Sequence, residues 1–226
     1  MAAHTQIIDL YGIPACGKST LAAYMRSNNG FKKIGTWADA KKEMRKSSMF
    51  KKLNCISFMA YWDGLRFAYF FPRANREKRS LCSWLNSPTI RSFIRKYSQY
   101  DIIVCEHGMA QSIISWEGGI DFHEYINFKQ LVKNYIRHSS DSIFVRCNVS
   151  IGTAISRIKS RNRDSGRLDI QRSNDNEIEN LFIQEKMRFD RLSDILNESD
   201  AVTFELDTEQ NPKDSMEKLC QLIEKK

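Results

Sequence analysis

The sequence has no closely spaced cysteines. Its six cysteines are scattered and none forms a C-x-x-C pair, so no zinc or redox motif of that kind is present. They stand at Cys16, Cys55, Cys82, Cys105, Cys147 and Cys220. Cys105 and Cys147 lie in apolar, strand-like runs, where buried free thiols are common. The set as a whole is typical of a reduced, intracellular protein.

The sequence also lacks a segment that would carry the chain to or across a membrane. Only residues 1–4 precede the first strand-like run, which leaves no room for a signal peptide. The most apolar stretch, residues 55–71, carries Asp63 and Arg66 near its middle. Each charge would cost roughly 2.5–3.5 kcal/mol at the centre of a bilayer. We therefore interpret this stretch as a largely buried helix, with an interfacial or partner-binding surface as the alternative, and expect a cytoplasmic protein without membrane contact.

Internal repeats, low-complexity linkers and a recognisable Ser-His-Asp arrangement are absent as well. The 226 residues, of which 42% are hydrophobic and 27% charged, fit a single globular domain with a sizeable core. Lys and Arg (35) exceed Asp and Glu (27) by +8. A positive field suits polyanionic partners such as nucleotides or nucleic acid. Net charge alone does not choose between these partners and simple solubility.

The most informative motif that is present is Gly12-Ile13-Pro14-Ala15-Cys16-Gly17-Lys18-Ser19, which has the P-loop (Walker A) spacing G-x-x-x-x-G-K-[ST]. Glycines at both ends allow a tight loop whose N–H groups point at an anion. Lys18 can reach the β- and γ-phosphates of a nucleotide, and the Ser19 hydroxyl can hold Mg²⁺. The nucleotide-binding candidates are Gly12, Ala15, Cys16, Gly17, Lys18, Ser19 and Thr20.

The flanking segments support the motif. Residues 5–11 are typical of a short buried strand and residues 19–28 of a helix, which is the order that a P-loop requires. Strand-like and helical segments alternate along the rest of the chain, which predicts an α/β fold with a parallel sheet between two helical layers. Further strands are expected at 31–34, 101–106, 142–147 and 201–206, and further helices at 37–53, 55–71, 74–85, 89–97, 122–138, 151–161, 177–196 and 213–224.

Glu106 ends the strand expected at 101–106, and a second polar residue, His107, follows it. Ligands of parallel sheets gather at the carboxyl ends of the strands, so Glu106 is expected near the P-loop. A carboxylate there could hold a Mg²⁺-bound water or accept a proton from a hydroxyl group. The alternative is a helix-capping or ion-paired acid. His107 is next to it and could donate a hydrogen bond to a substrate.

An arginine cluster follows the strand expected at 142–147. Its members are Arg157, Arg161, Arg163, Arg167 and Arg172. Arginines on a mobile lid can stabilise the charge that develops during phosphoryl transfer. A solvated basic loop or a nucleic-acid patch are the alternatives. Arg73, at the end of the aromatic stretch, could bind an acceptor phosphate or lie on a surface helix.

In the order of these parts the sequence resembles the P-loop kinases, and most closely their thymidylate kinase and nucleoside kinase branch. The P-loop matches residues 12–20, and Phe70-Phe71-Pro72-Arg73 resembles an aromatic helix that ends in a phosphate-binding arginine. Glu106-His107 and Gln111 are similar to an acid-arginine pair followed by a glutamine, with His107 in place of the arginine. Residues 157–167 resemble the arginine-rich lid of these kinases.

The resemblance implies further roles and has two departures. It implies that the loop from Asp207 to Pro212 packs on the adenine of ATP. The glycine-rich acceptor motif that usually follows the second strand of thymidylate kinases is absent, and a basic, aromatic region at 32–71 takes its place. With the missing arginine, this puts thymidine monophosphate in doubt as the acceptor.

These observations predict one P-loop kinase domain over 1–226, with a helical acceptor-side insertion at about 37–100 and a lid at about 157–176. The expected activity is ATP- and Mg²⁺-dependent phosphoryl transfer to a small molecule, most simply a nucleotide or nucleoside. The expected catalytic residues are Lys18, Glu106, Arg161 and Arg163, and the expected Mg²⁺ ligands are Ser19 and Glu106. The ATP-binding residues include Arg157 and Asp207. The expected acceptor-binding residues are Arg73, His107, Gln111 and Arg167. Two alternative functions stay open: a kinase for a sugar or antibiotic, and a nucleotide-switched nucleic-acid-binding protein. Whether the protein forms a homodimer also stays open.

Overall fold

A parallel sheet of five strands, in the order β2-β3-β1-β4-β5, forms the centre of the molecule. The computed structural model describes residues 5–27, 33–56, 58–70, 78–117, 125–137, 142–160, 175–209 and 211–224. The strands are β1 (Gln6–Tyr11), β2 (Ile34–Thr36), β3 (Ile102–Cys105), β4 (Ser142–Asn148) and β5 (Val202–Asp207). The central strand β1 is almost entirely buried, as its run of apolar residues predicts.

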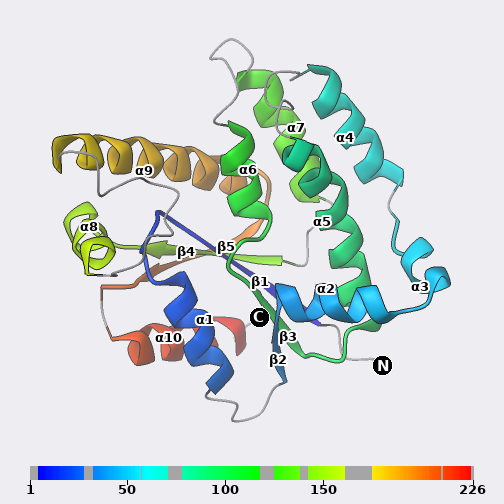
Figure 1. Ribbon diagram of the computed structural model, residues 1–226, viewed down its shortest axis with the longest axis horizontal. Helices are drawn as coiled ribbons and strands as arrows, with labels where there is room; N and C mark the ends of the chain where they lie inside the picture. The colour runs from blue at the N-terminus through cyan, green and yellow to red at the C-terminus, as the bar shows by residue number, and fades with distance from the viewer. Residues whose placement is uncertain are drawn as a thin grey trace.

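Helices cover both faces of this sheet (Figure 1). Helices α1 and α10 pack together on one face, and α6 and α9 lie on the other. This confirms the expected three-layer α/β architecture. The helices are α1 (Lys18–Ser27), α2 (Trp37–Lys46), α3 (Met49–Leu53), α4 (Phe58–Phe70), α5 (Lys78–Tyr97), α6 (Met109–Glu117), α7 (Tyr125–Arg137), α8 (Ile151–Lys159), α9 (Asp175–Asn197) and α10 (Pro212–Glu224).

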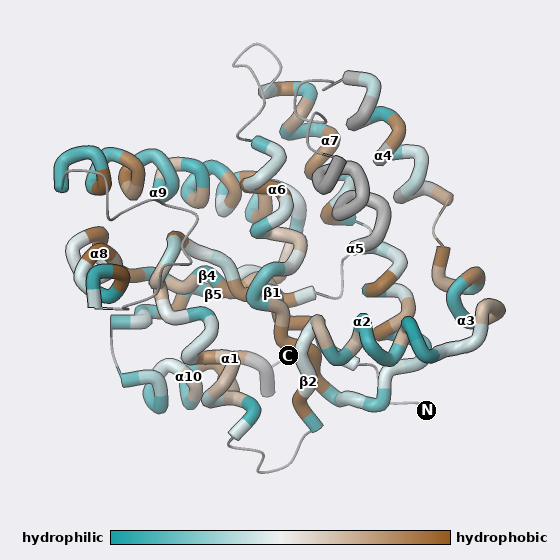
Figure 2. The backbone as a smooth tube through the Cα atoms, viewed as in Figure 1, coloured by the Kyte–Doolittle hydropathy of each residue, from teal (hydrophilic) through white to brown (hydrophobic). Residues whose placement is uncertain are grey.

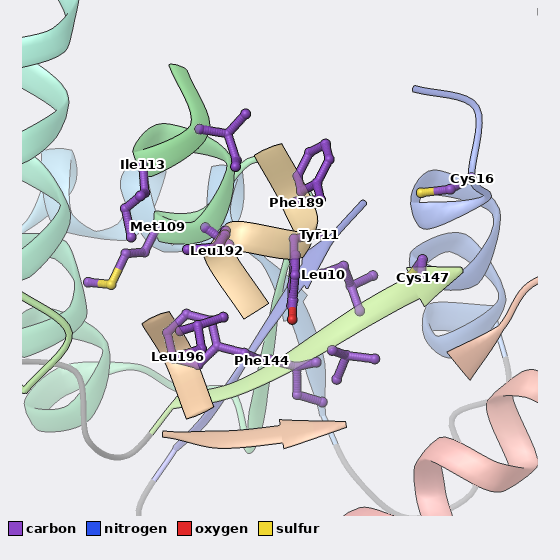
Figure 3. Packing of buried hydrophobic residues seen from close by; sticks show 14 of the residues in the cluster. Leu10, Tyr11, Cys16, Met109, Ile113, Phe144, Cys147, Phe189, Leu192 and Leu196 are labelled. Atoms are coloured by element: carbon purple, nitrogen blue, oxygen red, sulfur yellow. The ribbon is translucent and has the colours of Figure 1, made fainter. Parts of the chain in front are cut away.

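The main hydrophobic core lies where the sheet meets these helices (Figure 3). Tyr11, at the end of β1, packs against Phe189 of α9 with ring centroids 6.3 Å apart. Its hydroxyl is 3.1 Å from Ser193 Oγ, so the phenol satisfies its hydrogen bond inside the core. The contact fixes the end of β1, and with it the point where the P-loop begins.

Several expected boundaries are wrong. The two helices expected at 74–85 and 89–97 are one helix, α5, with Pro88 inside it. A proline removes one backbone hydrogen bond, but the burial of Ile90, Phe93 and Ile94 on the next turns outweighs that loss. The helix expected at 37–53 is interrupted at Ser47, whose backbone is extended. Helix α6 was not expected at all.

The aromatic stretch was expected to be largely buried, and this is wrong for one face of α4. Phe58, Trp62, Leu65 and Tyr69 stand at helical spacing with 54–81% of their surface exposed. The opposite face carries the buried Asp63 and packs on α5 and α7. Figure 2 shows the apolar residues of α3 and α4 at the periphery of the molecule. No helix in the described part of the chain is long and apolar enough to cross a bilayer.

Candidate functional site

The P-loop has the conformation that its glycines predict. It connects β1 to α1, and the left-handed region is occupied by Gly12 (φ 145°), Ala15 (φ 59°) and Gly17 (φ 96°). A Cβ at Gly12 would lie 2.5 Å from the carbonyl oxygen of Cys147, so only glycine fits there. Ser19 and Thr20 are exposed in the first turn of α1. The positive end of α1 therefore faces the space where an anion would bind.

Lys18 folds back over this loop. Its ammonium donates to the carbonyl oxygens of Gly12 at 2.8 Å and Ile13 at 3.1 Å, and to Cys16 Sγ at 3.3 Å. These carbonyl and sulfur acceptors can be exchanged for phosphate oxygens, which form shorter, charge-assisted hydrogen bonds. The lysine is thus held next to the anion site before any ligand arrives.

Cys16 is an unusual member of the loop because its thiol is buried against a second thiol, that of Cys147 at the end of β4 (Figure 3). A hydrogen bond from Cys147 and the nearby Lys18 ammonium lower the pKa of Cys16 to about 6, although burial opposes this. The same hydrogen bond and burial raise the pKa of Cys147 well above its usual value. Of these two neighbouring thiols, Cys16 is therefore the one that ionises more readily.

The acidity of Cys16 can be tested by a pH titration of the protein followed by ultraviolet absorbance. We expect a thiolate signal that appears between about pH 5 and pH 7 and is lost in Cys16→Ser. Cys147→Ser is the matched control, because the serine hydroxyl can still donate a hydrogen bond to Cys16. The folded pKa of Cys16 lies below its unfolded value, so its ionisation stabilises the fold fully at high pH, and that contribution is lost as the pH falls through about 6. A thiolate signal that appears only near the ordinary thiol pKa would contradict this assignment.

A small cavity of about 190 Å³ adjoins the loop on the α1 side. Gly17, Thr20, Leu21, Arg157, Thr208, Pro212 and Ser215 line it. Arg157 closes one side, because its guanidinium donates to the carbonyl oxygen of Thr208 at 2.8 Å and to that of Ala15 at 3.4 Å. Pockets that hold a whole drug-sized ligand measure about 300–1,000 Å³, so this cavity has room for only part of such a ligand.

Asp207 ends β5 at the rim of this region. Its side chain is exposed and accepts a hydrogen bond from the backbone N–H of Glu209 at 2.9 Å. Its carbonyl oxygen accepts from the Ser215 hydroxyl at 2.9 Å. Asp207 therefore shapes the loop between β5 and α10, while Thr208 is the member of this loop that lines the cavity.

Glu106 and His107 form a turn between β3 and α6 on the other side of the loop. Because β3 pairs with β1 in parallel, with Asp9 opposite Cys105, Glu106 follows at the level where β1 runs into the P-loop. Glu106 is half-buried and His107 is exposed. Gln111 is half-buried in the first turn of α6. The structure thus brings these candidates to the expected edge of the sheet.

The remaining site candidates lie outside the described residues. They are Arg73, Arg161, Arg163 and Arg167. Of the arginine cluster, only Arg157 is described, and it contacts the P-loop rather than a lid. The lid at about 157–176 and the roles of its arginines stay predictions.

Sequence reasoning missed a buried ion pair behind the site. Asp9 in β1 and Arg91 in α5 are both completely buried, and Arg91 Nη2 donates to Asp9 Oδ2 at 2.5 Å. Burial raises the pKa of Asp9, while Arg91 and the N–H of Met109 lower it. The signal was present in the sequence: an aspartate inside the apolar run Ile7–Leu10 needs a buried partner.

A larger depression, of about 440 Å³, lies between β4, β5 and α9. Its charged groups already bind one another, since Arg146 pairs with Asp190 and lies 4.0 Å from Glu205. It includes no residue of the P-loop, so we assign the site to the smaller cavity.

Two solved structures that share this architecture are a nucleoside kinase and a nucleotide kinase. Deoxyadenosine kinase from M. mycoides, with bound dCTP, superposes with a TM-score of 0.54 at 18% identity, over 97% of this chain and 100% of that one. Thymidylate kinase from Candida albicans superposes with a TM-score of 0.53 at 16% identity, over 100% of this chain and 93% of that one. This chain has the nucleoside-kinase fold. No family model matches the sequence, and no curated protein matches it.

Proposed function

We propose that the protein is a kinase that transfers the γ-phosphoryl group of ATP to a nucleoside or nucleotide. The observation that carries the proposal is the placement of the P-loop between a small cavity on one side and the Glu106 turn on the other. A nucleotide would then span the loop, with its base in the cavity and its terminal phosphate toward Glu106. The fold shared with deoxyadenosine kinase and thymidylate kinase supports this class of acceptor.

Each group has a role in this arrangement. The loop amides and Lys18 bind the β- and γ-phosphates, and Thr208 and Arg157 border the base. With a nucleoside as the acceptor, Glu106 orients the acceptor hydroxyl and accepts its proton. His107, on the same turn, and Gln111, in the first turn of α6, bind the acceptor, as would Arg73. Arg161 and Arg163 would stabilise the transferred group when the lid closes, and Arg167 would bind the acceptor.

Magnesium fits the donor set at this site. Mg²⁺ prefers oxygen ligands and usually takes only one or two from the protein, with water and phosphate oxygens supplying the rest. The exposed hydroxyl of Ser19 beside the loop and the carboxylate of Glu106 meet that preference. When bound, the ion would neutralise charge that builds up on the phosphates. The residues themselves align the phosphates and the acceptor.

The test is ADP formation by the purified protein with Mg²⁺ and ATP, against deoxynucleosides, nucleoside monophosphates and sugars. The proposal expects ADP formation that depends on a nucleoside or nucleotide and stops when a chelator removes Mg²⁺. Turnover with a sugar alone would mean that the acceptor is not a nucleoside or nucleotide but belongs to another class of molecule. ATP binding without acceptor-stimulated turnover would contradict the proposal, and steep salt-dependent binding to DNA or RNA would then favour the nucleotide-switched alternative.

A further inference from the structure

Asp9 does more than pair with Arg91, because its carboxylate also lies at the N-terminus of α6. Asp9 Oδ2 accepts the backbone N–H of Met109 at 2.7 Å, and the N–H of Ala110 also points to this carboxylate. The first N–H groups of a helix have no partner within the helix, and a negative charge there is favourable. A residue 100 positions earlier in the chain therefore caps α6.

The backbone at Gly108 passes so close to the Asp9 carboxylate that a side chain at this position would have no room. A Cβ at Gly108 would overlap both carboxylate oxygens of Asp9. Gly108 is buried and directly follows Glu106 and His107. The turn that carries the two acceptor-side residues is thus pressed against Asp9, and its course depends on where that carboxylate sits.

Arg91 fixes the carboxylate in turn. Its guanidinium bonds to Asp9 and to the Ser142 hydroxyl at the start of β4, and it lies 5.6 Å from the centre of the Trp37 ring in α2. All three contacts hold a planar, pre-organised group in one orientation. The ion pair therefore links β1, β4, α2 and α5 to the beginning of α6.

Resting on the kinase function proposed above, we propose that Asp9 is a positioning residue: anchored by Arg91, its carboxylate fixes the start of α6 and thereby holds Glu106 beside the P-loop. A small displacement of a reacting group costs about a hundredfold in rate. The pair would thus influence turnover although neither member touches a substrate.

The first experiment measures the exchange of backbone amide hydrogens without any ligand. In Asp9→Asn, exchange at Met109 and Ala110 is expected to speed up by at least about tenfold, because a charged acceptor is lost. Asp39→Asn is the matched control: Asp39 caps α2, accepting from the Thr36 N–H at 2.9 Å, and its loss should leave α6 unchanged. If Asp9→Asn does not fold, Asp9→Asn/Arg91→Met, which leaves no unpaired charge, takes its place. Unchanged exchange at α6 would overturn the proposal.

The second experiment is a double-mutant cycle between Asp9 and Glu106 in the kinase assay. Asp9→Asn is expected to lower kcat by roughly ten- to a hundredfold while the KM for ATP changes by less than about twofold. If Asp9 acts through Glu106, Asp9→Asn adds almost nothing in the Glu106→Gln background. Losses that multiply would show a general structural role and overturn the proposal. A wild-type protein that turns over no acceptor would instead contradict the kinase function, and the exchange measurement would still decide the role of Asp9.

Discussion

Replacement of Lys18 by alanine is expected to lower kcat for phosphoryl transfer by roughly 10²–10³-fold or more. The ammonium already lies over the P-loop, where its present acceptors are two carbonyl oxygens and the sulfur of Cys16. In the reaction it would bind oxygens that gain negative charge toward the transition state. A pre-organised positive group stabilises that charge without the solvent reorganisation that a water molecule would need.

The same substitution is expected to leave the fold intact. Lys18 contacts only acceptors within the loop, and its side chain is half-buried. The melting temperature should therefore change by no more than a few degrees, as for other substitutions outside the core. Lys129→Ala is the control, since Lys129 lies in α7 and pairs with Glu198 at the surface. Near-normal turnover in Lys18→Ala, or an equal loss in Lys129→Ala, would contradict the role of the P-loop.

The largest effect on stability is expected for Arg91→Ala. Truncation of this side chain leaves the completely buried carboxylate of Asp9 without its cation, which typically costs about 3–5 kcal/mol. For a protein of this size each kcal/mol lowers the melting temperature by about 2–4 °C, so a decrease on the order of 10 °C is expected. Thermal unfolding followed by circular dichroism measures it.

Two variants make the interpretation of Arg91→Ala specific. Arg188→Ala removes an arginine from the surface pair with Glu185 and should cost less than about 1 kcal/mol. Asp9→Asn/Arg91→Met removes both charges while the asparagine oxygen can still accept the Met109 N–H, and should recover most of the stability lost in Arg91→Ala. If the double variant is less stable than Arg91→Ala, the loss comes from packing and not from an unpaired charge.

The P-loop and the parallel sheet could be predicted because their signals are local. The loop from Gly12 to Ser19 is defined by residue types at fixed spacing, and each buried strand is a short apolar run next to a helical pattern. Glu106 followed from the same logic, since a residue that ends a parallel strand must lie at the ligand-binding edge.

The ion pair could not be predicted in the same way. Asp9 and Arg91 are 82 residues apart, and nothing in the sequence marks which of many arginines turns inward. Helix α6 was missed because a cap of its N-terminus comes from far away in the sequence: the carboxylate of Asp9, in β1, accepts the Met109 N–H. Pro88 misled the prediction of α5, because the tertiary packing of the following turns overrides a local helix-breaking signal.

The central claim is that the P-loop and the Glu106 turn together transfer a phosphoryl group to an acceptor. It is tested most directly by supplying ATP labelled in its γ-phosphate, with Mg²⁺ and one deoxynucleoside or nucleoside monophosphate at a time, and separating the products. The account predicts that the label appears in the nucleoside or nucleotide product, and that Lys18→Ala removes it. Label found only in inorganic phosphate, or retained entirely in ATP with every acceptor, would contradict it.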